Sequence, residues 1–162
     1  MITDKGIDFV TRHEGFVSKA YRDPVGIITI GTGFTNRSKT AAKMLGPIKL
    51  GMTITREQND RVLKAAFLDE YGPPVDREFP AGKPDHVYDA GYSYVFNCGA
   101  GALSDKWVKK LKGGSTSAAA DALLSSRVTA KGKRLPGLVR RRKEEASLLE
   151  FGDYGVVNTS RS

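Results

Sequence analysis

The spacing of apolar residues predicts a helix near the start of the chain. Ile7, Val10 and Glu14 follow one another at i, i+3 and i+7, so they share one helical face. Thr3 or Asp4 would cap this helix, which would end at about Glu14. Because the face is mostly apolar, we expect the carboxyl group of Glu14 to lie beside apolar side chains.

From residue 16 to about residue 35 the helical period disappears, and the pattern favours a small antiparallel sheet. The "DPVG" at 23–26 has proline second and glycine fourth, which is typical of a turn. The β-branched "IITI" at 27–30 then predicts a strand. Glycines at positions 31 and 33 indicate a tight backbone or close approach to a ligand.

Helical patterns account for most of the remaining chain. They predict helices at about residues 55–71, 85–96, 104–111 and 136–151, with the segment "AAADALLSS" set apart by "GGSTS". Thr55 begins a capping box, Ser104 would cap the third helix and Pro136 would open the last. "GPP" at 72–74 predicts a helix end and a loop to residue 84. A small sheet followed by many helices predicts an α+β, mostly helical fold, with a frayed tail after Gly152.

Composition narrows the class of protein. With 162 residues, 40% hydrophobic and 27% charged, the chain fits a soluble globular domain or two small lobes sharing a core. Cys98 is the only cysteine, so no internal disulfide is possible. The first residues lack a basic start followed by an apolar core, and we expect neither a signal peptide nor a membrane span.

The net charge of +8 favours polyanionic partners such as nucleic acid, anionic lipid or bacterial cell wall. "VRRRKEE" at 139–145 is the strongest cluster. Its acidic and basic residues are offset by three or four positions, as on a solvated helix face. The same residues are also compatible with a polyanion-binding face. No aromatic residue interleaves with these arginines, which weakens a single-strand nucleic-acid platform.

Three residues are candidates for chemistry, although each also has an ordinary structural interpretation. Glu14 could be a simple helix-end carboxylate, but a carboxyl group among apolar side chains holds its proton more strongly, as a general acid must. Asp23 suits the first position of a turn, where it bonds the backbone two residues on. Thr29 suits a strand by shape. His13 and His86 have no metal-ligand spacing, so we expect no zinc site.

The stretch "HEGFVSKAYRDPVGIITIGTG" at 13–33 joins these residues in one pattern. Asp23 follows Glu14 by nine residues, Thr29 follows six later, and "TIGTG" completes the run. It resembles the catalytic segment of the phage T4-like lysozymes, the endolysin family of glycoside hydrolases (family 24). "YVFNCGAGAL" and "LPGLVRRRKEEASLL" resemble its central and C-terminal helices, so the likeness covers roughly residues 6–151. Phe34 stands where a relative has histidine, and we carry no ion pair over.

The resemblance implies a lysozyme-like fold and a muramidase activity. Residues 1–162 would form one catalytic domain, with a small N-terminal antiparallel sheet lobe at about 15–60. A larger helical lobe would take about 61–162 plus the N-terminal helix, with the substrate cleft between. The enzyme would hydrolyse the β-1,4 bond between N-acetylmuramic acid and N-acetylglucosamine in peptidoglycan.

The resemblance also implies residue roles. Glu14 would be the general acid, Asp23 the carboxylate that stays ionised, and Thr29 would help hold the attacking water. Asn97 would contact the sugar from the helical lobe. No cofactor or metal is implied.

The expected partner is peptidoglycan, with anionic outer-membrane or wall polymers attracting the basic chain and no nucleic acid involved. We expect a monomer made in the cytoplasm of the host bacterium. It would reach the periplasm and cell wall after a separate membrane-permeabilising protein opens the way.

Two other functions stay open. A lytic transglycosylase would cut the same bond with one glutamate and no water, and Asp23 and Thr29 argue against it. A basic polyanion-binding module would depend on the arginines and lysine at 140–143.

Overall fold

The structure is a computed structural model that describes residues 1–155. The fraying expected for the tail lies outside the described residues from residue 156 onward. Its first helix, α1 (Asp4–Glu14), confirms the prediction. Thr3 caps it by accepting a hydrogen bond from the Gly6 amide at 3.0 Å. Gly15 ends it with a φ of 81°, a conformation that favours glycine.

The small antiparallel sheet is also confirmed. Strand β1 (Val17–Arg22) pairs with β2 (Ile28–Gly31), placing Tyr21 opposite Thr29. Gly31 has a φ of 67°, and a Cβ there would lie 2.2 Å from Oδ1 of Asn59. The group that approaches this glycine is therefore a side chain of the protein itself.

Helix α2 (Lys39–Leu45) lies between the sheet and the next predicted helix, in a segment for which the sequence analysis predicted no element. Helix α3 (Arg56–Ala66) follows, with both halves of the Thr55 capping box. The predicted stop at "GPP" is wrong. The chain continues through a π-helical turn (Phe67–Tyr71) into α4 (Gly72–Glu78), so residues 72–78 are helix rather than loop. The amide of Gly72 donates to the carbonyl of Phe67, and both prolines occupy the first turn of α4, where their missing N–H groups cost little.

The helical lobe comprises α5 (Asp85–Cys98), a 3₁₀ turn (Ala100–Ser104), α6 (Lys106–Lys112), α7 (Thr116–Leu123) and α8 (Pro136–Phe151). The last helix begins at Pro136 as predicted. Asp105, not Ser104, precedes α6, because the Ser104 hydroxyl donates to the Gly101 carbonyl within the 3₁₀ turn. A short hairpin, β3 (Thr129–Ala130) with β4 (Lys133–Arg134), was not predicted, since four exposed residues carry no alternating pattern.

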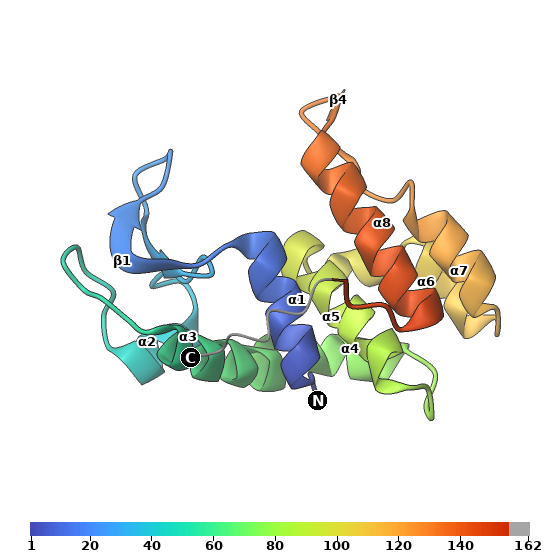
Figure 1. The fold of residues 1–162 in the computed structure, drawn as a ribbon, viewed down its shortest axis with the longest axis horizontal. Coiled ribbons are helices and arrows are strands. Elements are labelled where there is room, and N and C mark those ends of the chain that lie inside the picture. Colours follow the sequence, from blue (N-terminus) through green and yellow to red (C-terminus); the bar gives the residue numbers. More distant parts are fainter. Residues whose placement is uncertain (156–162) are drawn as a thin grey trace.

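Figure 1 shows how these elements are arranged. The β1–β2 hairpin and α8 lie on opposite sides of the C-terminal end of α1, and α3 and α4 follow one another along the base. The core surrounds α5, where the Trp107 ring packs edge-on at 5.0 Å from the Tyr94 ring. The fold is α+β with a helical majority, as predicted. None of the helices described is both long and apolar enough to cross a membrane.

Candidate active site

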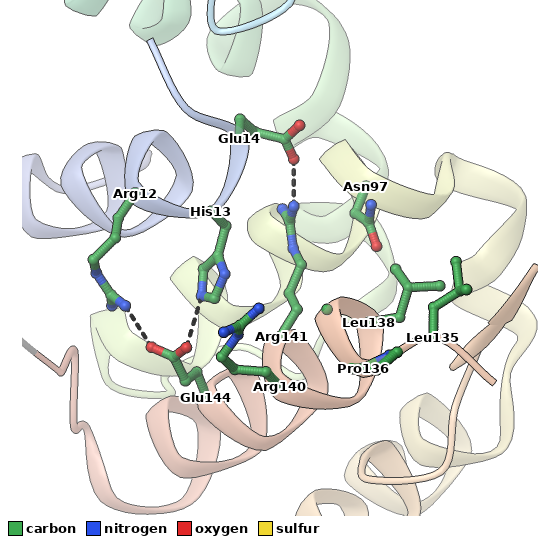
Figure 2. Close-up of a pocket in the computed structure, with 11 residues that line it drawn as sticks. Arg12, His13, Glu14, Asn97, Leu135, Pro136, Leu138, Arg140, Arg141 and Glu144 are labelled. Atoms are coloured by element: carbon green, nitrogen blue, oxygen red, sulfur yellow. Dashed lines mark hydrogen bonds and ion pairs between the residues drawn. The ribbon is translucent and has the colours of Figure 1, made fainter.

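Glu14 is the last residue of α1 and lies beside a pocket of about 750 Å³. The pocket lies between the C-terminal turn of α1 and the first half of α8 (Figure 2). Its lining residues are Arg12, His13, Glu14, Asn97, Leu135, Pro136, Gly137, Leu138, Arg140, Arg141 and Glu144. The structure thus places two of the four sequence-predicted site residues, Glu14 and Asn97, on one pocket.

The expected apolar surroundings of Glu14 are wrong. Ile7 and Val10 are fully buried, but the side chain of Glu14 is 23% exposed, and Oε2 accepts a hydrogen bond from the guanidinium of Arg141. Glu14 occupies the last turn of α1 and lines the pocket, where its carboxyl group meets a guanidinium. The partner comes from α8, which lies 127 residues later in the chain.

Arg141 and its neighbour Arg142 contact the candidate residues Glu14 and Asn97, and the sequence analysis missed both arginines. Neither the solvated face nor the polyanion-binding face describes them, because both are buried. They lie on either side of the carboxylate of Glu145, which is itself 0% exposed. The only signal was the run of charges at 139–145, and the sequence does not tell which of these charges face inward.

The second arginine fixes Asn97. The guanidinium of Arg142 lies 4.8 Å from the centre of the Tyr94 ring and donates to Oδ1 of Asn97. Asn97 is exposed at the end of α5, so this bond sets the orientation of its amide at the pocket. The adjacent Cys98 also accepts from Arg142, at 3.0 Å, and burial raises the pKa of its thiol.

Asp23 lies in the turn between β1 and β2, as predicted. Its Oδ1 accepts hydrogen bonds from the backbone amides of Val25 and Ile27, both at 2.9 Å. Thr29 is buried in β2, and its hydroxyl donates to the carbonyl of Ile27 at 3.0 Å. Both residues therefore attach to Ile27, on the hairpin across from α8, and neither lines the pocket beside Glu14.

His13, next to Glu14, is kept neutral by its surroundings. Burial, and then the positive charge of Arg141, lowers its pKa from 6.5 to about 4, against the opposing effect of Glu144. Its Nε2 is 3.7 Å from a Glu144 oxygen and has no hydrogen-bond partner among the described residues. No group of three metal-ligating side chains occurs in residues 1–155.

A small sheet, a larger helical lobe and a glutamate at the end of the first helix together define a lysozyme-like glycosidase. The model of the phage lysozyme family matches residues 11–145, and the chain belongs to this family. It is 32% identical to an endolysin of Acyrthosiphon pisum secondary endosymbiont phage 1, over 92% of this chain and 97% of the relative. The endolysin of Salmonella phage P22 is 34% identical, over 91% and 97%.

Solved structures agree with this assignment. An endolysin from Escherichia coli O157:H7 phage FAHEc1 superposes with a TM-score of 0.80 at 31% identity, over 96% of this chain and 97% of that one. The protein is a lysozyme-type glycoside hydrolase, an endolysin that degrades cell-wall peptidoglycan in host lysis. A transglycosylase or a polyanion-binding module is not favoured.

Proposed function

We propose that Glu14, Asp23 and Thr29 carry out the hydrolysis, at the β-1,4 bond between N-acetylmuramic acid and N-acetylglucosamine. Glycoside hydrolysis needs one group to protonate the leaving oxygen and another to activate water or to balance charge on the sugar ring. The observation that carries the proposal is the position of Glu14, at the end of a helix and on a pocket wide enough for a sugar ring, with its carboxyl group oriented by Arg141.

Glu14 would act as the general acid through its second oxygen. Arg141 donates to Oε2, whereas Oε1 accepts no hydrogen bond from the described residues. Oε1 is therefore the atom that can carry the transferred proton.

Asp23 would be the ionised carboxylate of the pair, and the two backbone N–H groups that donate to its Oδ1 hold it in one orientation. Thr29 would hold the attacking water. Its hydroxyl hydrogen is used in the bond to Ile27, so the oxygen presents its remaining lone pairs as acceptors.

Asn97 would bind the sugar through its amide nitrogen. Arg142 occupies Oδ1, so the NH₂ group is the part of the amide that is left to bind the sugar, and it does so as a donor. Sugar hydroxyl and acetamido oxygens are acceptors of the matching kind. In this single catalytic domain, residues 15–60 would then form one wall of the substrate cleft, and the remaining residues would form the other.

The decisive experiment is a turbidity assay on permeabilised Gram-negative cells with Glu14→Gln. We expect the lysis rate to fall by about 10²–10⁴-fold, the usual contribution of a general acid. The melting temperature should hold or rise, since glutamine can still accept from Arg141 and active-site residues are seldom optimised for stability. Glu78→Gln, which alters an exposed ion pair with Lys112, is the matched control. Full lysis by Glu14→Gln would refute the assignment.

Mass spectrometry of the digested wall separates hydrolysis from the transglycosylase reaction. Hydrolysis leaves a reducing sugar end, whereas a transglycosylase leaves an anhydro-sugar end. An anhydro-sugar product would overturn the roles given to Asp23 and Thr29.

We further propose that the enzyme is a monomer that is made in the host cytoplasm and reaches the wall through a lesion formed by a separate protein. The net charge of +8 would then concentrate it on anionic wall and outer-membrane polymers. Cells producing the chain alone should keep their turbidity until a membrane-permeabilising agent is added. Lysis without that agent would contradict this route.

A further inference from the structure

Glu145 is a fully buried carboxylate that the reaction itself does not use. It is 0% exposed, on the inner face of α8. Three groups donate to its two oxygens: Nε of Arg141 at 3.3 Å, Nη1 of Arg142, and the hydroxyl of Ser93 at 2.6 Å. Oε2 therefore accepts two hydrogen bonds and Oε1 one, all from fixed donors, and the carboxylate has a single orientation.

Each of the two arginines reaches a different residue of the candidate active site. Arg141 uses Nε for Glu145 and Nη1 for Glu14, while its Nη2 donates to the Ser93 carbonyl at 3.1 Å. Arg142 uses Nη1 for Glu145 and Nη2 for Asn97. The two candidate residues on the pocket, Glu14 and Asn97, are thus both held through arginines that bond the buried Glu145.

We propose that Glu145 is a positioning residue for catalysis, which fixes Glu14 through Arg141 and Asn97 through Arg142. The inference rests on the proposed function, because it gives Glu145 its role through Glu14. A planar guanidinium held at two edges cannot rotate without breaking a bond, so a second partner for each arginine determines where its free edge points.

Stability alone is a weak reason for such a network. Burying ions costs solvation energy, and a buried ion pair is often no more stabilising than apolar residues of the same volume. Here two carboxylates and two guanidiniums balance in charge, and the two arms end on the pocket. If Glu145 serves to position the active site, its substitution should change kcat more than it changes the free energy of unfolding.

Glu145→Gln tests the proposal. Glutamine keeps the size and one acceptor oxygen, but its NH₂ group faces a guanidinium donor, so one arginine must turn away. Because a catalytic group displaced by about 1 Å can lose on the order of a hundredfold in rate, we expect kcat on purified sacculi to fall by at least about tenfold. Because Arg141 is the cation bonded to Glu14, a change in its position should also displace the alkaline limb of the pH–rate profile.

The titratable and charged groups around Glu14 come from three elements. They are Arg12 and the neutral His13 of α1, Arg140, Arg141 and Glu144 of α8, and Tyr71 of the π-helical turn, whose pKa burial, Glu70 and Glu14 raise. The substitution changes the identity of none of these residues. Glu78→Gln serves as control and should keep both kcat and the pH profile of the unaltered enzyme. A folded Glu145→Gln variant that also keeps both would overturn the proposal.

Ser93→Ala decides the matter if Glu145→Gln does not fold. It removes one hydroxyl that donates to Glu145 and accepts from Arg141, while all ion pairs remain. We expect a several-fold loss of kcat with a smaller displacement of the alkaline limb, because Arg141 loses one of its fixed contacts, and an unchanged kcat and profile would overturn the proposal. Failure of the proposed function is read separately, from full activity of Glu14→Gln.

Discussion

The two carboxylates of the candidate active site are held in opposite ways. Asp23 is fixed by backbone amides two and four residues further along its own turn. Glu14 is fixed by a side chain from α8, which a buried carboxylate orients in turn. One half of the site is therefore a local property of six or seven residues, whereas the other half exists only when distant helices pack.

The largest expected effect lies on the packed side. Arg141→Met would leave Glu145 with a buried charge only partly compensated, and removal of one partner from a buried pair costs about 3–5 kcal/mol. Urea unfolding should show this loss in the free energy of unfolding. Lys143→Met, which removes an exposed charge from the same helix, should cost less than about 0.5 kcal/mol. Similar costs for both would show that α8 does not depend on the buried network.

On the local side, activity and stability should separate. Asp23→Asn keeps the carbonyl oxygen that accepts from Val25 and Ile27, so the free energy of unfolding should change by less than about 1 kcal/mol. The lysis rate should fall by on the order of a hundredfold, because the amide cannot take the role of an ionised carboxylate. Asp23→Ala should lose activity and the turn together. A fully active Asp23→Asn variant would remove Asp23 from the mechanism.

Gly31 tests whether the sheet side has any long-range attachment. A Cβ would approach Asn59 Oδ1 to 2.2 Å in a backbone with a φ of 67°, so Gly31→Ala should cost about 1–3 kcal/mol. Gly33→Ala has a positive φ of 106° but no atom within 4 Å of the added carbon. The difference between the two melting temperatures isolates the contact with Asn59, and equal shifts would show that backbone strain alone is responsible.

The smallest expected effect is a pH dependence on the packed side. Burial lowers the pKa of His13 from 6.5 to about 4, so between these values the unfolded chain takes up a proton that the folded protein refuses. Stability should therefore fall as the pH drops from about 6.5 to about 4, by about 1–2 kcal/mol after allowance for solvent screening. Thermal melts of His13→Gln should lack this component. An identical pH dependence in both proteins would assign it elsewhere.

The same contrast explains how much could be predicted from the sequence. The Thr3 cap, the Thr55 capping box, the Asp23 turn and the start of α8 at Pro136 were predictable, because each signal spans about four residues. Spacing also named Glu14, Asp23 and Thr29 as candidates, and their catalytic roles remain predictions.

What the sequence did not reveal depends on contacts between distant segments. The pairing of Glu14 with Arg141 spans 127 residues, and no local pattern marks which arginine of "RRR" faces inward. The apolar stripe of α1 therefore suggested the wrong surroundings for Glu14. The sequence "GPP" is typical of a helix end, and the continuation past it was therefore missed. The hydrogen bond from the Gly72 amide to the Phe67 carbonyl belongs to the π-helical turn that joins α3 to α4.

That wide turn between α3 and α4 has a consequence for the rest of the chain. Successive side chains of an α-helix differ in direction by about 100°. The extra residue of the π-helical turn therefore rotates the side chains of α4 by roughly that angle relative to α3. Val75 on α4 is thereby buried against the helical lobe, although α3 directs Val62 and Leu63 into the core at its own end. Deleting a single residue of this turn would rotate α4 so that Val75 no longer faces the helical lobe.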